Sequence, residues 1–196
     1  MSFYNLSSAI ESRRSMLEVE MAMPTAANLV MKDNSVFSRV GFRGKGVEGF
    51  LTERGYLVPA KPNQSVLNES GLLVLRLSQS EFWLIDSTND NHEAIYELEI
   101  ASQNLSAVYR LYCQHSHACF AIKGENVGLM FAKICGVDLR DETFAVNAIA
   151  QTSVARTNAI IVRQIISGEE VFILLADMAS SVYLWHAIDD AITEFK

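Results

Sequence analysis

The sequence predicts an α+β fold in which two similar ferredoxin-like lobes, related by an internal repeat, form one compact body. Two observations support this prediction. The residues around Gly44 resemble those around Gly124, and each segment is followed by an apolar hairpin and then a helix. Similarity at one fixed spacing indicates that the same structural unit is built twice.

Each copy is expected to open with a strand and a short helix. A turn glycine, Gly44 or Gly124, follows the strand, and Gly55 or Gly136 ends the helix. Apolar residues then recur at helical spacing. These residues are Val47, Phe50 and Leu51 in the first copy, and Val127, Met130, Phe131 and Ile134 in the second.

Each copy is expected to close with a hairpin and a second helix. Apolar runs over 72–86 and 160–177 are each interrupted by a short polar turn, which is typical of two paired strands. The apolar positions of the closing helices are Ile95 and Leu98 in the first copy, and Leu184, Ile188, Ala191 and Phe195 in the second. The predicted lobes are 37–107 and 108–196, and together they form one structural domain over 37–196.

Residues 1–36 stand outside the repeat and are interpreted as an N-terminal arm. Ser8 to Glu11 has the form of a helix capping box. Four of the seven methionines fall in one stretch of the arm, at Met16, Met21, Met23 and Met31. The arm either folds back on its own lobes or docks on a partner. We expect that deletion of residues 1–30 would leave both lobes folded and weaken assembly.

Composition narrows the class of protein. The chain has 196 residues, of which 49% are apolar and 20% charged, with a formal net charge of −7. This composition predicts a folded protein and argues against nucleic acid or an anionic membrane as a partner. The apolar runs are short and the three cysteines are odd in number, so we expect a cytoplasmic protein with free thiols.

A glycine pattern at the first turn could hold a dinucleotide. Gly44, Gly46 and Gly49 satisfy G-x-G-x-x-G between a predicted strand and a predicted helix. A Rossmann unit also needs a second parallel strand after the helix, and Pro59 and Pro62 occupy that region. We therefore assign no cofactor-binding residue in this chain.

The segment from Cys113 to Cys119 carries two cysteines and two histidines at alternate positions. On one strand these four side chains would form a row nearly 20 Å long, which cannot close around one metal ion. We predict no metal site. His115 and His117 are either satisfied residues of a half-buried strand or loop, or contacts to a small molecule or a partner.

Catalytic groups are not evident. The sequence has no G-x-S-x-G elbow, and residues 143–168 contain no Asp or Glu, so we assign no catalytic residue. Arg156 lies in this stretch. It is either a solvated end of a strand or a contact to an anion.

Motifs in both copies resemble one family, the gamma subunit of heterotetrameric sarcosine oxidase. The resemblance runs from about Val36 to Phe195 and excludes the arm. Its motifs are Leu57-Val-Pro59 with Pro62-Asn63, Gly71 to Leu77, Glu81-Phe-Trp83-Leu, Ile134 to Arg140, Phe144, Ala150 to Thr157, and Tyr183-Leu-Trp185.

The resemblance implies a fold like the folate-binding domain of aminomethyltransferases, including the T-protein of the glycine cleavage system. It implies a non-catalytic, architectural chain with alpha, beta and delta subunits as partners. The complex would oxidise sarcosine to glycine, yielding hydrogen peroxide and formaldehyde or, with tetrahydrofolate, methylene-tetrahydrofolate. FAD, FMN, NAD, zinc and tetrahydrofolate are implied for the other subunits.

The alternative is a free-standing folate-binding or one-carbon-transfer protein related to aminomethyltransferases. That family has a functional Asp near the region that matches Asn158 to Ile160, where this sequence has no carboxylate. Ser116-His117 is similar to the family's Ser-His pair, with spacing to Gly124 that differs by one residue. The resemblance therefore transfers no catalytic residue to this chain.

Overall fold

The computed structural model describes residues 13–17, 25–26 and 28–195. Their contacts divide them into two units. Unit 1 contains Arg13, Arg14 and residues 36–115, and unit 2 contains residues 15–17, 25–26, 28–35 and 116–195. Each unit is built on one antiparallel sheet with helices, so the chain has the α+β class that the sequence predicts.

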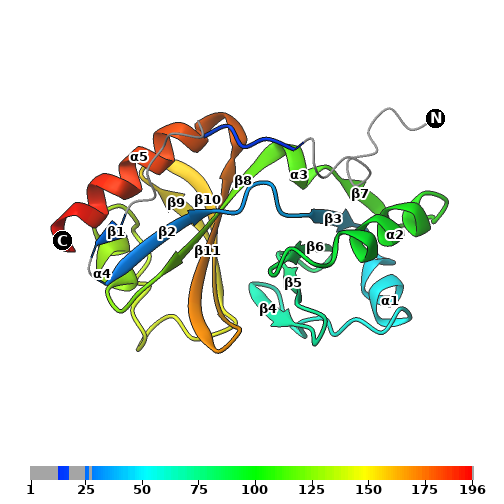
Figure 1. Cartoon of the computed structure of the whole chain (residues 1–196). Helices are drawn as coiled ribbons and strands as arrows, with labels where there is room; N and C mark the ends of the chain where they lie inside the picture. Colours follow the sequence, from blue (N-terminus) through cyan, green and yellow to red (C-terminus); the bar gives the residue numbers. More distant parts are fainter. Residues whose placement is uncertain (1–12, 18–24, 27, 196) are drawn as a thin grey trace. The chain divides into compact units, whose positions relative to one another are not determined.

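Unit 1 contains a five-stranded antiparallel sheet of order β4-β5-β6-β3-β7 (Figure 1). The order β7-β3-β6-β5 is that of a split βαβ unit, and β4 adds an edge strand. Two helices, α1 and α2, follow β3 and β6. The bounds are β3 Arg39–Arg43, α1 Val47–Thr52, β4 Gln64–Leu67, β5 Leu72–Arg76, β6 Glu81–Asp86, α2 His92–Ser102 and β7 Tyr109–Leu111.

Both helices of unit 1 pack on one face of its sheet. Alternate strand residues, such as Val40 and Phe42 of β3, point to this face because successive side chains of a strand point to opposite sides. Phe42 meets Phe50 of α1 edge to face, with ring centroids 5.3 Å apart. Leu51 of α1 and Leu98 of α2 complete a core in which these side chains are almost fully buried.

Unit 2 contains a six-stranded antiparallel sheet of order β1-β2-β8-β11-β10-β9. The short helix α3, Cys113–Ser116, immediately precedes β8, and α4 and α5 follow β8 and β11. The bounds are β1 Thr25–Ala26, β2 Leu29–Asp33, β8 His117–Lys123, α4 Val127–Ala132, β9 Ile149–Val154, β10 Thr157–Ile166, β11 Glu169–Asp177 and α5 Ser181–Ile192. Two 3-10 turns, η3 (Met178–Ser180) and η4 (Thr193–Phe195), flank α5.

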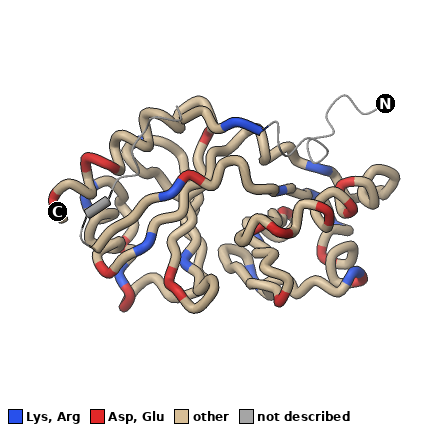
Figure 2. The backbone as a smooth tube through the Cα atoms, in the orientation of Figure 1, with Lys and Arg blue, Asp and Glu red and all other residues tan. Residues whose placement is uncertain are grey.

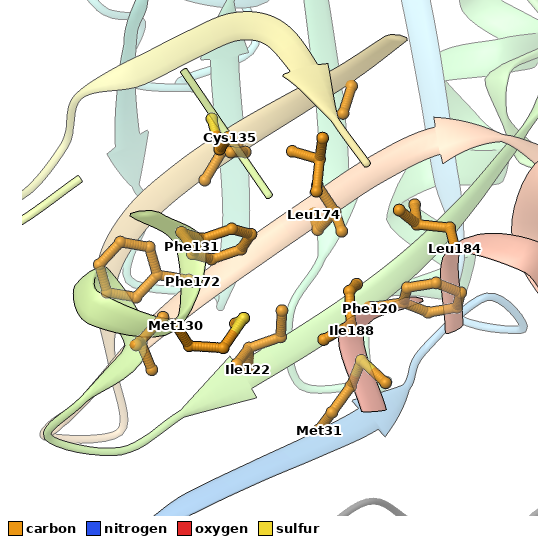
Figure 3. Packing of buried hydrophobic residues seen from close by; sticks show 14 of the residues in the cluster. Met31, Phe120, Ile122, Met130, Phe131, Cys135, Phe172, Leu174, Leu184 and Ile188 are labelled. Carbon is orange, nitrogen blue, oxygen red and sulfur yellow. The ribbon is translucent and has the colours of Figure 1, made fainter. Parts of the chain in front are cut away.

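The core of unit 2 lies between its sheet and the helices α4 and α5 (Figure 3). Phe131 of α4 packs against Phe172 of β11, with ring centroids 6.1 Å apart. Phe120 of β8 meets Trp185 of α5 edge to face at 5.3 Å. Met31 of β2 is fully buried in the same cluster.

The structure differs from the expected arm at residues 28–33. β2 pairs with β8 in the sheet of unit 2, and Leu29 and Met31 are both 0% exposed. The sequence repeat did not reveal this strand, because β2 lies before both copies. Deletion of residues 1–30 would remove Leu29 from this core, so we no longer expect unit 2 to tolerate it. Ser8 to Glu11, Met21 and Met23 lie outside the described residues.

The helices, hairpins and closing helices that the sequence predicts are present in both units. The internal repeat itself remains a prediction. Lys and Arg residues are interspersed with Asp and Glu along the backbone of each unit (Figure 2). Within the described residues, no helix is long and apolar enough to cross a membrane.

Candidate functional site: a neutral hollow beside His117

A hollow of about 380 Å³ lies at the end of the unit 2 sheet where β8 begins. A volume of this size is within the range of small-molecule sites. Its lining comes from four neighbouring strands and comprises His117, Gln151, Thr152, Asn158, Ala159, Ile160 and Leu175.

Strand register brings these residues together. Leu175 of β11 is opposite Ile160 of β10, which is in turn opposite Gln151 of β9. His117 lies two residues before Cys119, which is opposite Leu175 on the other side. Because residues two apart share a face, His117 and Leu175 lie on the sheet face opposite the helices, whereas Ala118 and Phe120 point into the helix-covered core.

Several contacts fix the start of β8. The Cα of His117 is paired with that of Asp177, the last residue of β11. The amide N–H of Cys119 donates to Ser35 Oγ at 2.9 Å, and the N–H of Asn34 donates to the Cys119 carbonyl at 2.8 Å. Ser116 Oγ lies 2.7 Å from His117 Nδ1, within hydrogen-bond distance. The imidazole of His117 is thereby oriented by its neighbour in sequence.

The hollow suits hydrogen bonding more than acid and base chemistry. Its lining includes two amide side chains, one hydroxyl, one imidazole and three apolar side chains, and no Asp, Glu, Lys or Arg. His117 is the one ionisable side chain among the lining residues. A proton-transferring pair would need a second titratable group within reach, and the lining supplies none.

The other two predicted contacts do not reach this hollow. His115 lies exposed in α3, and its backbone N–H donates to the Tyr112 carbonyl at 3.1 Å. Arg156 is exposed in the two-residue turn between β9 and β10, where its φ is +65°. Neither lines the hollow, so only His117 of the three is placed in it.

The Cys113 to Cys119 segment is not one strand. Residues 113–116 form the helical turn α3, and only His117 and Cys119 belong to β8. The row of four side chains considered for a single strand therefore does not form. Across the part of the chain that the structure describes, no group of three His, Cys, Asp or Glu side chains could hold a metal ion.

The glycine-rich turn at Gly44 uses its amides internally. The N–H of Gly44 donates to the Ser80 carbonyl at 2.8 Å, and that of Gly46 donates to the Ala107 carbonyl at 3.0 Å. The helix that follows, α1, has only six residues. A phosphate-binding turn needs amides that point toward the ligand. These two amides point into the protein instead.

The stretch without carboxylates contains one buried cation, Arg163. Its guanidinium lies 2.9 Å from Asp141 and 2.5 Å from Glu170, one on each side of the stretch. Nη1 also donates to the Phe144 carbonyl. The charge of Arg163 is thus compensated by carboxylates that the local sequence does not reveal.

Sequence reasoning missed Gln151 and Thr152 as site residues. Both lie in the segment 150–157 that carries the family resemblance. Pairing β9 with β10 in the register observed would have placed Gln151 opposite Ile160. The sequence contains the segment that carries these residues, but it does not show the register in which β9 pairs with β10.

No protein-family model and no curated protein matches this sequence. Solved structures do match its fold. Heterotetrameric sarcosine oxidase from Corynebacterium sp. U-96, solved in complex with pyrrole 2-carboxylate, has a chain that is 22% identical with a TM-score of 0.69. The match covers 85% of this chain and 85% of that chain.

A second match is to the glycine cleavage system aminomethyltransferase T from Bartonella henselae, with 19% identity and a TM-score of 0.60. It covers 84% of this chain and 46% of that chain, so this protein spans just under half of the aminomethyltransferase. The two matches bear out the expected relationship in fold to sarcosine oxidase and to aminomethyltransferases.

Proposed function

We propose that this chain is the non-catalytic gamma subunit of a heterotetrameric, flavin-dependent sarcosine oxidase. The observation that supports the proposal most is the extent of the match to a chain of such an oxidase, which covers 85% of both chains. The match to the aminomethyltransferase leaves more than half of that longer chain uncovered. The match therefore extends over a larger share of the oxidase chain than of the aminomethyltransferase.

In this proposal the alpha, beta and delta subunits are the partners, and the complex is cytoplasmic. The complex converts sarcosine, water and oxygen to glycine, formaldehyde and hydrogen peroxide, or forms methylene-tetrahydrofolate when tetrahydrofolate is present. FAD, FMN, NAD and zinc are held by the other subunits. A structural role agrees with a hollow whose lining has only one titratable side chain, His117.

Purification of the tagged chain from its native cells tests the proposal. We expect three further subunits in stoichiometric amounts and sarcosine-dependent peroxide production by the complex. The same chain purified alone and supplied with FAD and FMN should produce no peroxide. Peroxide production by the single chain, or a chain that purifies without flavoprotein partners, would contradict the proposal.

A second candidate function is a free-standing folate-binding or one-carbon-transfer protein. The hollow beside His117 favours it, because its lining combines amide and imidazole groups with apolar side chains, which together can bind a planar ring with hydrogen-bonding edges. Titration of the isolated chain with tetrahydrofolate separates the two candidates. Micromolar binding that is lost in His117→Ala and Asn158→Ala would support this candidate.

Arg156→Ala and His115→Ala are the matched controls, because neither residue lines the hollow. If Arg156 is instead a contact to an anionic partner, its replacement should weaken subunit assembly without changing tetrahydrofolate binding. If His115 contacts a partner, His115→Ala should likewise weaken subunit assembly and leave tetrahydrofolate binding unchanged. Together, the variants at His117, Asn158, Arg156 and His115 distinguish residues that contact a ligand from residues that contact a partner subunit.

A further inference from the structure

The β9–β10 hairpin supplies most of the hollow beside His117. Five of the seven lining residues belong to it, namely Gln151, Thr152, Asn158, Ala159 and Ile160. In the order of the described strands of unit 2, β9 is the last and lies next to β10 alone. The shape of the hollow therefore depends on how the free end of this hairpin is held.

The turn of the hairpin has an unfavourable backbone conformation. Ala155 and Arg156 both have positive φ angles, +46° and +65°. A side chain in this region crowds its own backbone, which is why such hairpin turns favour Asn and Gly. Strained conformations of this kind persist where the surrounding structure holds them, and they cluster at ligand sites. Neither turn residue here is Asn or Gly, so contacts from outside the hairpin are needed to hold the turn.

Two such contacts are made by Ala155. The hydroxyl of Tyr183, in α5, donates to the Ala155 carbonyl at 3.0 Å. The N–H of Ala155 donates to the Ile134 carbonyl at 2.7 Å, beside an antiparallel bridge between Cys135 and Val154. Both backbone groups of Ala155 are thus bonded to segments outside the hairpin, and Tyr183 supplies the bond to its carbonyl.

Tyr183 holds the turn from a well-packed helix. Leu184 and Trp185, next to it in α5, are 0% and 3% exposed in the core of unit 2, whereas Tyr183 is 55% exposed. Because half of this residue is exposed, loss of its hydroxyl removes the bond to the turn and leaves the core packing unchanged. The hydroxyl therefore serves the hairpin more than the helix.

The register of the hairpin carries the position of the turn to the hollow. Val154 pairs with Thr157 on either side of the turn, and Ser153 pairs with Asn158 one step further. Asn158 lines the hollow. Because antiparallel partners are joined step by step, a turn that opens displaces Asn158 before the residues further along the strands.

We propose that Tyr183 is a positioning residue for the hollow beside His117. Its hydroxyl holds the turn at Ala155 and thereby fixes where Asn158 and Gln151 meet a bound ring. Tyr183 does not line the hollow, so it acts through the hairpin and not by contact with the ligand. The ligand, tetrahydrofolate, is that of the second candidate function, on which this part of the proposal rests.

Tyr183→Phe removes only the hydroxyl and tests the proposal in the full chain. Amide hydrogen exchange, measured by mass spectrometry, should become about three- to tenfold faster over residues 151–158, because one hydrogen bond to the turn is lost. Exchange over β8 and β11 should not change. The dissociation constant for tetrahydrofolate, measured by calorimetric titration, should rise by about the same factor. Tyr109→Phe, the same change at an exposed tyrosine of unit 1, should behave like the wild type in both measurements.

A rescue variant separates positioning from general stability. Ala155→Asn and Arg156→Gly introduce turn residues that favour positive φ angles, so the turn no longer needs the hydroxyl. Added to Tyr183→Phe, they should return both the exchange over 151–158 and the affinity for tetrahydrofolate to the wild-type values. If Tyr183 only stabilised α5, a change in the turn would restore neither.

Three results would overturn the proposal. The first is unchanged exchange over 151–158 in Tyr183→Phe. The second is exchange that rises equally over β8 and β11, because the hydroxyl would then stabilise the unit as a whole. The third is faster exchange of the hairpin with unchanged affinity in a chain that binds tetrahydrofolate. A wild-type chain that does not bind tetrahydrofolate would contradict only the second candidate function, and the exchange and rescue measurements would still decide whether Tyr183 holds the hairpin in place.

Discussion

Gly44 and Gly124 share one backbone conformation, with φ angles of +139° and +134°, and each faces a backbone carbonyl at close range. A Cβ atom would lie 2.0 Å from the Ala107 oxygen at Gly44 and 1.8 Å from the Asn28 oxygen at Gly124. Ala107 lies just before β7, and Asn28 just before β2. The two turns thus correspond in backbone conformation and in their close approach to a backbone carbonyl.

Gly44→Ala and Gly124→Ala should each destabilise the unit that carries them by at least about 2 kcal/mol, because a side chain meets both an unfavourable φ and a backbone oxygen. In a chain of this size that is a fall in Tm of roughly 4 to 8 °C. Thermal unfolding followed by circular dichroism measures the effect.

Gly49→Ala is the matched control for both glycine variants. Gly49 lies within α1, and a Cβ there would have no heavy atom within 4 Å. Alanine in a helix is favoured over glycine by about 0.5–1 kcal/mol, so this variant should be as stable as the wild type or slightly more so. Equal losses of stability in all three variants would show that the close approach of the two glycines to Ala107 and Asn28 does not determine the effect.

The sequence predicted the elements of the fold better than their partners. Apolar spacing at Val47, Phe50 and Leu51 is a local signal, and α1 appears where it predicts a helix. The pairing of β2 with β8 is not local, because Met31 meets Ile122 across about ninety residues of sequence. No periodicity within residues 1–36 encodes that partner.

The candidate site shows the same limit. From the sequence, His117 is either a satisfied residue of a strand or loop or a contact, and in the structure it lines a hollow. Its neighbours Gln151 and Asn158 come from β9 and β10, so their proximity depends on a register that the sequence pattern leaves open. The helical turn α3 was also missed, because four residues are too few to show a period.

Asp86 should be a major determinant of unit 1 stability. Its carboxylate is fully buried and accepts hydrogen bonds from the backbone N–H groups of Thr88, Asn89, Asp90 and Asn91. Asp86→Ala would remove the charged acceptor that these four N–H groups share, at a cost of about 2–4 kcal/mol. Urea unfolding measures the loss.

Asp90→Ala is the control for the Asp86 variant, because Asp90 is exposed and contributes its backbone N–H to the same loop. Its effect should remain within about 0.5 kcal/mol. Asp86→Asn should fall between the two, since the amide oxygen still accepts but carries no charge. A loss in Asp90→Ala as large as that in Asp86→Ala would assign the effect to the loop sequence instead.

The turn between β9 and β10 can be improved. Ala155 and Arg156 have φ angles of +46° and +65°, and Val154 is paired with Thr157, which defines a two-residue hairpin turn. Such turns favour Asn-Gly, so the double variant Ala155→Asn, Arg156→Gly should raise stability by about 1 kcal/mol. Tyr183 would keep its bond to the carbonyl of residue 155.

Arg156→Lys separates conformation from charge at this turn. Lysine keeps the positive charge and meets the same unfavourable φ, so no gain in Tm is expected. A gain in Arg156→Lys equal to that of the double variant would contradict the conformational argument.

The Asp138–Arg140 pair predicts a defined pH dependence. Hydrogen bonds from Arg140 hold the pKa of Asp138 well below its ordinary value. A carboxyl whose pKa is lower in the folded state stabilises the fold at pH values above its unfolded pKa, and this contribution is lost as the pH falls. In Arg140→Gln the pKa of Asp138 should rise toward its ordinary value in an NMR titration, whereas Arg140→Lys should keep it partly depressed. An unchanged pKa in Arg140→Gln would assign the shift to other groups.

Replacement by alanine should reduce stability strongly at one methionine of the N-terminal cluster and hardly at all at another. Met31 is fully buried beside β8, whereas Met16 is 57% exposed. Met31→Ala leaves a cavity in the core of unit 2 and should cost about 2–5 kcal/mol, while Met16→Ala should change stability by less than about 0.5 kcal/mol. Denaturant unfolding of the two variants compares them directly. If Met31→Ala proved as harmless as Met16→Ala, β2 would not be an integral strand of the sheet, and the arm would extend further along the chain than the pairing with β8 implies.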